Sequence, residues 1–174
     1  MTAARIRRAE TGDAAVLLAI YAPIVRDTAI SFETTAPGEA EFAGRIAASN
    51  AHHAWLLAER DGVIAGYAYA TAYRARQAYR YSAEVSVYVH EQARGTGVGS
   101  ALYRELFAVL AGLGYFQAYA AITLPNPQSV GLHRRVGFRR VGTLPRVGFK
   151  FGAWHDVSWW HRPLQRGRPE ATAP

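Results

Sequence analysis

The chain has 174 residues, of which 50% are hydrophobic and 19% charged, so its composition is that of a globular protein and not of a disordered or membrane-spanning chain. It contains no cysteine, which excludes disulfides, thiolate metal sites and a cysteine nucleophile. Its first residues hold no apolar stretch that could serve as a signal peptide, so we expect a cytoplasmic protein. The formal net charge of +7 permits anionic partners, but the arginines are scattered, and we expect neither nucleic acid nor a membrane as partner.

The first half of the chain predicts a strand, two helices and a hairpin. A short strand is expected at 5–7. Apolar residues share one face of a helix that begins near Ala14, namely Val16, Leu17, Ile20 and Ile24. A second helix is expected from Glu39 to Ser49. Strands are expected at 55–59 and 63–71, joined by a turn at Asp61-Gly62, and the aromatic and arginine-rich stretch 73–81 has no clear period and reads as a loop.

The second half alternates strands and helices. We expect strands at 83–89 and 117–123, helices at 101–113 and 126–136, and β segments at 138–144 and 153–162. Leu102, Leu106, Val109, Leu110 and Leu113 form the apolar face of the first of these helices. One domain is expected over 1–164. The remainder, 165–174, is rich in proline, glycine and arginine and is expected to be disordered.

These elements predict the fold class. The strand, loop, helix and strand between residues 83 and 123 imply a parallel pair of strands, while the hairpin segments on either side imply antiparallel neighbours. The sequence therefore predicts an α+β fold with a mixed, mostly antiparallel sheet and helices on both faces.

A glycine-rich loop lies between the 83–89 strand and the following helix: Arg94, Gly95, Thr96, Gly97, Val98, Gly99 and Ser100. The glycines allow an anion to approach the backbone, and the N–H groups of the helix start form an anion cradle that suits a diphosphate. The loop lacks the lysine of a Walker sequence and the spacing of a dinucleotide-binding fingerprint. A tight turn without a ligand remains the alternative.

The pattern R-x-x-G-x-G after a valine-rich strand resembles the acetyl-CoA loop of the GNAT superfamily of N-acetyltransferases. Gly137-Phe138 closing the last helix and Asn126 opening it are similar to that family too. A closer similarity, to the phosphinothricin and methionine sulfoximine acetyltransferase branch, rests on several short stretches, which are Ala78-Tyr79, Glu84, Val87-Tyr88-Val89, Leu124-Pro125-Asn126, Ser129-Val130, Leu132-His133 and Gly152-Ala153-Trp154-His155-Asp156-Val157.

The resemblance implies acetyl-CoA as co-substrate and no metal. It implies that the pantetheine arm pairs with the backbone of Val87, Tyr88 and Val89 and that the pyrophosphate lies on the amides from Arg94 to Ser100. Asn126 and Ser129 are implied as further cofactor contacts. Sheet packing by the two valines does not conflict with this role, because the role uses backbone groups.

Acetyl transfer needs a base for the ammonium group and a donor or stabiliser for the leaving thiolate. Glu84 stands where the family has its base, which usually acts through water, and an ion pair with Arg80 or Arg76 is the alternative. His133 stands where many GNAT enzymes have a tyrosine acid, and the branch resembles this chain in having histidine there. An ordinary helix histidine bonded to a carbonyl is the alternative for His133.

The expected acceptor is the α-amine of a small amino-acid analogue, such as phosphinothricin, methionine sulfoximine or methionine sulfone, acetylated in a resistance reaction. Arg74, Arg76 and Arg80 place positive charge just before Glu84, which suits a carboxylate. Candidate substrate contacts are Phe32, Tyr73, Arg74, Ala75, Arg76 and Val85. Phe32 and Trp154 are candidate pocket walls, although packing in the core is favoured for both.

The resemblance also implies a homodimer formed through C-terminal elements. Two other functions remain open: acetylation of a protein N-terminus or lysine, or of another small amine, and a non-catalytic domain that binds CoA as a sensor.

Overall fold

The computed structural model describes residues 4–169, and residues 1–3 and 170–174 lie outside that description. Seven strands and four α-helices follow one another along the described chain. The elements are β1 (Arg5–Arg8), α1 (Ala14–Asp27), α2 (Glu39–His52), β2 (Trp55–Arg60), β3 (Val63–Ala72), β4 (Ser82–Val89), α3 (Val98–Gly112), β5 (Gln117–Thr123), α4 (Pro127–Arg135), β6 (Arg139–Lys150) and β7 (Ala153–Pro163).

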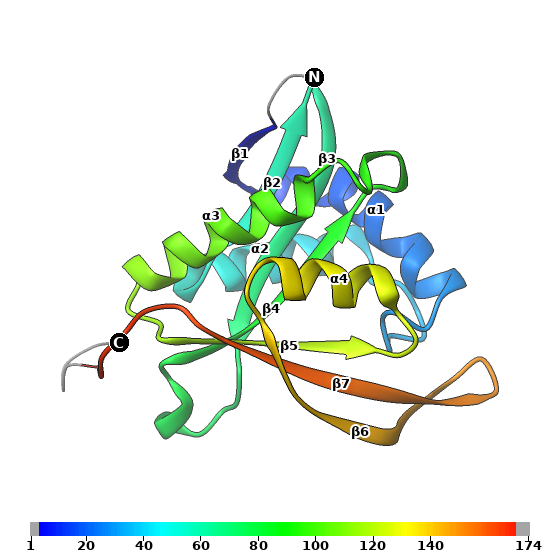
Figure 1. The fold of residues 1–174 in the computed structure, drawn as a ribbon. Helices are drawn as coiled ribbons and strands as arrows, with labels where there is room; N and C mark the ends of the chain where they lie inside the picture. The colour runs from blue at the N-terminus through cyan, green and yellow to red at the C-terminus, as the bar shows by residue number, and fades with distance from the viewer. Residues whose placement is uncertain (1–3, 170–174) are drawn as a thin grey trace.

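The strands form one sheet in the order β1-β2-β3-β4-β5-β7-β6. All neighbours run antiparallel except β4 and β5, which are parallel. Their pairing covers Ser82, Ala83 and Glu84 of β4 and then stops. Figure 1 shows the two strands diverging beyond this point, so the sheet opens along the rest of β4.

Helices cover both faces of the sheet (Figure 1), and each face has its own apolar cluster. On one face α3 packs Leu102, Leu106 and Leu110 against the strands. On the other face α1 and α2 pack Leu17, Tyr21, Phe42 and Ile46 against Trp55, Leu57 and Tyr67. The expected mixed sheet with helices on both faces is confirmed.

Several element boundaries differ from expectation. Helix α3 begins at Val98 and not at Ala101, because Gly97 adopts the left-handed conformation that turns the chain into the helix. Strand β6 continues past 144 to Lys150 because it pairs with β7 as far as Ala153. The Asp61-Gly62 turn is confirmed, with φ values of 51° and 77°.

Two apolar residues expected on helix core faces are exposed, Val16 at 41% and Leu113 at 40%. Val16 lies at the margin of the buried stripe of α1, whereas Leu113 is the C-cap residue that follows the end of α3 at Gly112. Of the expected tail 165–174, the structure describes 165–169, and there the Gln165 side chain donates to the Tyr115 carbonyl at 2.9 Å. The expectation for 170–174 lies outside the described residues.

Candidate active site

The opening between β4 and β5 leads into a cavity of about 560 Å³, which we call the β4–α4 cavity. Its walls come from the end of β4, the glycine loop, the start of α3, and α4. Most of the cofactor contacts expected from the sequence line it together: Val87, Tyr88, Val89, Arg94, Gly95, Gly97, Val98, Gly99, Ser100, Asn126 and Ser129. Thr96 does not line it, because its hydroxyl turns back to donate to the Ala93 carbonyl at 2.7 Å.

The glycine loop presents N–H groups to this cavity. Gly95 and Gly97 have φ values of 75° and 89°, a conformation that other residues rarely adopt. The first N–H groups of α3 have no acceptor within the helix and carry the positive end of its dipole. The Ser100 hydroxyl is buried there and has no hydrogen-bond partner within residues 4–169. This end of the cavity is therefore suited to an anion such as a diphosphate.

Gly99 has a different role from the one that the sequence suggested. A Cβ atom at this position would lie 3.0 Å from Leu132 Cδ2 and 3.4 Å from Val89 Cγ2. Its missing side chain therefore allows the start of α3 to pack closely against α4 and β4. Space for an anion is instead found at Gly97, where a Cβ would meet no atom within 4 Å.

Beyond Glu84, β4 keeps its antiparallel partner β3 but loses β5, so one backbone edge of Val87, Tyr88 and Val89 faces the cavity. The side chains of Val87 and Val89 pack in the α3 cluster, whereas Tyr88 packs on the other face. Asn126 uses its side-chain oxygen to accept from the Ser129 N–H at 3.1 Å and thereby caps α4. Its amide NH₂ remains for a ligand.

Glu84 lies on the sheet face covered by α1 and α2, because β4 side chains alternate and Ala83 and Val85 pack in the α3 cluster. Its side chain is 31% exposed, and Arg74 Nη1 lies 3.9 Å from its carboxylate. Burial raises the pKa of the Glu84 carboxyl group, and the charge of Arg74 opposes that rise in part. A carboxyl group with a raised pKa is a better proton acceptor for an ammonium group.

Arg74 is the ion-pair partner of Glu84, whereas the alternative considered for Glu84 was an ion pair with Arg80 or Arg76. The Arg74 guanidinium lies 4.5 Å from the centre of the Tyr73 ring and 5.4 Å from that of Trp159, so the loop fold directs it along the sheet toward β4. Arg80 instead covers the Tyr81 ring at 4.5 Å.

The other candidate substrate contacts are dispersed. Ala75 and Arg76 are exposed. Val85 is buried at 2% exposure with its side chain in the α3 cluster, on the face opposite Glu84. Phe32 and Trp154 are 38% and 53% exposed, so packing in the core, which was favoured for both, is wrong. Phe32 lies so close to the β6–β7 hairpin that a Cβ on Gly148 would come within 2.1 Å of its ring.

His133 lies away from the cavity, between α3 and α4. It is 4% exposed, and both of its ring nitrogens have protein partners. Nδ1 lies 2.8 Å from the Ser129 carbonyl oxygen, and Nε2 lies 2.9 Å from the Tyr103 hydroxyl. Burial lowers the pKa of this imidazole. The geometry thus matches the alternative for His133, a neutral helix histidine bonded to a carbonyl.

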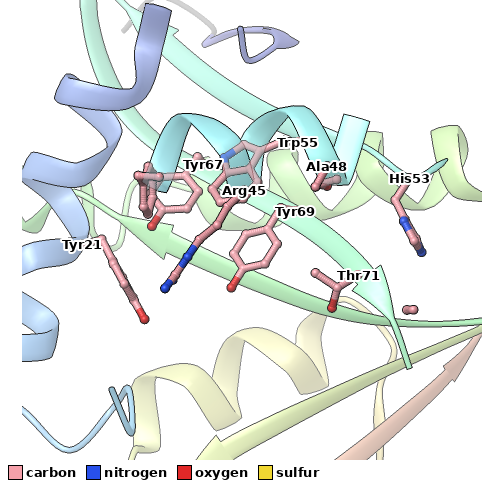
Figure 2. Close-up of a pocket in the computed structure, with 11 residues that line it drawn as sticks. Tyr21, Arg45, Ala48, His53, Trp55, Tyr67, Tyr69 and Thr71 are labelled. Carbon is pink, nitrogen blue, oxygen red and sulfur yellow. The ribbon is translucent and has the colours of Figure 1, made fainter. Parts of the chain in front are cut away.

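A second cavity, of about 380 Å³, lies on the Glu84 face between α2 and β3, and we call it the α2–β3 pocket (Figure 2). The residues that line it are Tyr21, Phe42, Arg45, Ala48, Ser49, His53, Trp55, Tyr67, Tyr69, Thr71 and Ala72. None was singled out from the sequence, since their apolar spacing predicts core packing. The sequence did contain one signal for this pocket: Tyr67 and Tyr69 are two residues apart on a strand and Trp55 lies on the neighbouring strand, so the three aromatic side chains share one face of the sheet.

Within residues 4–169 the structure has no group of three or more His, Cys, Asp or Glu side chains that could hold a metal ion. Nor does any helix of this part have the length and apolar character needed to cross a membrane.

Comparison with known proteins relates this geometry to a family. Residues 21–138 match the Acetyltransferase (GNAT) family. The chain is 42% identical over 167 residues to a phosphinothricin N-acetyltransferase of Alcaligenes faecalis, covering 95% of this chain and 85% of the relative. It is 34% identical over 175 residues to an L-methionine sulfoximine/L-methionine sulfone acetyltransferase of Pseudomonas paraeruginosa, covering 98% and 99%.

Among solved structures, a GNAT superfamily phosphinothricin acetyltransferase from Sinorhizobium meliloti in complex with acetyl-CoA superposes with a TM-score of 0.93 at 36% identity, covering 99% of this chain and 96% of that one. The matched region, the relatives and the shared fold together show that the chain is an N-acyltransferase of the acetyltransferase (GNAT) family.

Proposed function

We propose that the protein transfers the acetyl group of acetyl-CoA to the α-amine of small amino-acid analogues, with phosphinothricin, methionine sulfoximine and methionine sulfone as acceptors, and so inactivates such compounds. The observation that carries the proposal is the position of Glu84, which lies on the strand that lines the β4–α4 cavity and is paired with Arg74. The names of the relatives support the choice of acceptors.

Cofactor binding follows from the walls of the β4–α4 cavity. The amides from Arg94 to Ser100 would hold the pyrophosphate, the free backbone edge of Val87–Val89 would pair with the pantetheine arm, and Asn126, with Ser129 beside it, would bond to that arm through its amide. The fit is supported by the unpartnered Ser100 hydroxyl and by the open space at Gly97.

Direct transfer then needs the acceptor between this cavity and Glu84. Glu84 takes a proton from the acceptor ammonium, through water, and the free amine attacks the thioester carbonyl carbon. The C–N bond forms, the C–S bond breaks, the electron pair leaves with the CoA sulfur, and the second proton of the amine nitrogen passes through water to that thiolate. Arg74 would bind the acceptor carboxylate through two parallel hydrogen bonds. Phe32, Tyr73, Ala75, Arg76 and the Val85 backbone would complete the surroundings of the acceptor.

The test combines a variant with an acceptor panel. Glu84→Gln keeps the shape of the side chain and removes its basicity, so kcat should fall by about a hundredfold or more, while acetyl-CoA affinity measured by calorimetry should not change. In competition, the three amino-acid analogues should be preferred over polyamines, aminoglycosides and basic peptides. A fall in kcat of less than a few-fold would exclude Glu84 as the base, and preference for a cationic acceptor would overturn the substrate class.

We also propose a homodimer. Support comes from the β6–β7 hairpin, where Phe149, Phe151 and Trp154 are 58%, 62% and 53% exposed. Such a group of exposed aromatic side chains is typical of a protein interface. Light scattering should give the mass of a dimer at micromolar concentration, and a monomer there would contradict the proposal.

A further inference from the structure

The α2–β3 pocket has no role in the reaction as described so far, yet it begins beside the base. Thr71 lines the pocket and is the cross-strand partner of Glu84 in the β3–β4 register. Tyr69 also lines it and is the cross-strand partner of Ser86 on β4. Directly opposed side chains on neighbouring strands lie about 5 Å apart, so an acceptor whose amine is at Glu84 can direct its side chain into the pocket.

Aromatic rings form most of the wall, and their mutual packing fixes them in place. The Trp55 and Tyr69 rings are stacked with centroids 4.2 Å apart and an angle of 12°, and Trp55 also stacks on Tyr67 at 5.5 Å. Phe42 packs edge-on against Trp55 at 5.4 Å. Phe42, Trp55 and Tyr67 are at most 2% exposed, so the wall that they form is held rigidly by the core. A rigid apolar wall favours apolar groups, because the wall needs no ordering when it is contacted.

Polar groups meet at one end of the pocket. Figure 2 shows the hydroxyls of Tyr21 and Tyr67 and the guanidinium of Arg45 gathered at the end of the pocket away from Thr71. A side chain that fills the pocket therefore meets hydrogen-bonding groups at its far end.

The charge of Arg45 is already compensated. Its guanidinium donates to both carboxylate oxygens of Glu33, at 2.6 and 3.1 Å, and to Glu41 at 2.6 Å. Hydrogen bonds from Arg45 and Tyr21 outweigh burial and lower the pKa of the Glu33 carboxyl group, so this ion pair is charged on both sides at neutral pH. An anionic head group would thus find no free cation here, and neither carboxylate lines the pocket to attract a cationic one.

We propose that the α2–β3 pocket receives the side chain of the acceptor and that it selects uncharged side chains with an aromatic or apolar body. The inference rests on the proposed function, because it places the amine at Glu84. It extends the acceptors to aromatic amino acids such as phenylalanine and tyrosine, and among the analogues it favours the uncharged sulfone over the anionic phosphinate.

Two neighbouring alanines on α2 provide a matched test. Ala48 lines the pocket, whereas Ala47, which is also exposed, does not line it. Ala48→Trp should therefore fill the pocket, and Ala47→Trp should change the same helix without doing so. With phenylalanine as acceptor, Ala48→Trp should lower kcat/KM by about tenfold or more, the scale on which an enzyme pocket senses a change in side-chain size. With alanine as acceptor, whose methyl group does not reach the pocket, Ala48→Trp should leave kcat/KM unchanged. The control Ala47→Trp should leave kcat/KM unchanged for both acceptors.

Binding of the product gives a readout that does not depend on turnover. Calorimetry with N-acetylphenylalanine should show affinity in the wild type and in Ala47→Trp, and a loss of about tenfold or more in Ala48→Trp. Equal effects of Ala48→Trp on phenylalanine and alanine, or product affinity that is insensitive to Ala48→Trp, would overturn the inference. If acetyl-CoA binds but no acceptor is acetylated, the proposed function fails, and the product titration still decides whether the pocket takes the side chain.

Discussion

Replacing Tyr103 by phenylalanine separates a structural from a catalytic role of His133. The hydroxyl of Tyr103 is 2.9 Å from His133 Nε2, and the two side chains are 0% and 4% exposed. Because Nδ1 lies 2.8 Å from the Ser129 carbonyl, the imidazole proton is on Nδ1, and Nε2 accepts from the tyrosine. Tyr103→Phe removes that donor and leaves a buried acceptor without a partner.

The expected cost is about 1–3 kcal/mol, the penalty for a buried polar group left unpaired. In a chain of this length, about 1 kcal/mol corresponds to about 2–4 °C in Tm, so Tm should fall by about 2–12 °C. Urea denaturation measures the free energy of unfolding, and initial rates at saturating substrates measure kcat. A structural His133 predicts lower stability with kcat unchanged at temperatures well below Tm.

Tyr115→Phe is the matched control. Its hydroxyl donates to the His52 carbonyl at 3.1 Å, and His52 is exposed, so water can replace the lost donor. The control should therefore lose less stability than Tyr103→Phe. A tenfold fall in kcat on Tyr103→Phe, with the free energy of unfolding preserved, would refute this reasoning and return His133 to a proton-transfer role.

Three further changes test the site. Arg74→Gln removes the charge that opposes the raised pKa of Glu84, so the acidic limb of kcat/KM should move to higher pH. An ion pair this exposed is worth about 0.2–1 kcal/mol, so this shift accounts for a fall of about fivefold at most on that limb, in addition to the pH-independent fall expected from losing the proposed contact with the acceptor carboxylate. Gly97→Glu places a negative side chain where the backbone faces the β4–α4 cavity and should abolish acetyl-CoA binding in calorimetry. Gly148→Ala forces the Phe32 ring to move and should raise the KM of the acceptor while the affinity for acetyl-CoA is kept.

Each of these three predictions has a result that would contradict it, and Gly97→Glu has a matched control. Gly62→Glu, at a turn with a φ of 77° and open space around the glycine, introduces the same strain and charge outside the cavity. If it weakens acetyl-CoA binding as much as Gly97→Glu does, the glycine loop is not the anion site. An unshifted acidic limb in Arg74→Gln would mean that the ion pair is absent in solution. A change in acetyl-CoA affinity in Gly148→Ala would show that Phe32 belongs to the cofactor side.

Features encoded by short stretches could be predicted from the sequence. The β-branched run of β4, the glycines after it and the apolar face of α3 are each local, and together they imply the anion-binding turn. Glu84 could be found as the carboxylate of that strand. The Asp61-Gly62 hairpin also depends on two adjacent residues alone.

Features that depend on packing between distant segments could not be predicted. Tyr103 lies thirty residues from His133, and their hydrogen bond exists because α3 and α4 pack together. The choice of Arg74 over Arg80 depends on the aromatic rings of Tyr73 and Trp159, which come from different parts of the chain. Phe32 lies against Gly148 of the β6–β7 hairpin, more than a hundred residues away in the sequence. Its aromatic character alone therefore could not show whether it packs in the core or lies at the surface.

Strand β4 combines the two halves of the site because its two faces and its free edge have different environments. Ala83 and Val85 point into the α3 cluster, whereas Glu84 and Ser86 point to the opposite face, where we propose that the acceptor binds. The edge freed by the divergence of β5 faces the β4–α4 cavity. A polar substitution at Val85 should therefore act on stability, and one at Ser86 on acceptor selection, although the residues are adjacent. A shift of β4 by one residue would exchange these faces and bury the carboxylate in the α3 cluster. The register with β3 thus fixes the position of Glu84, the proposed base, relative to the free edge.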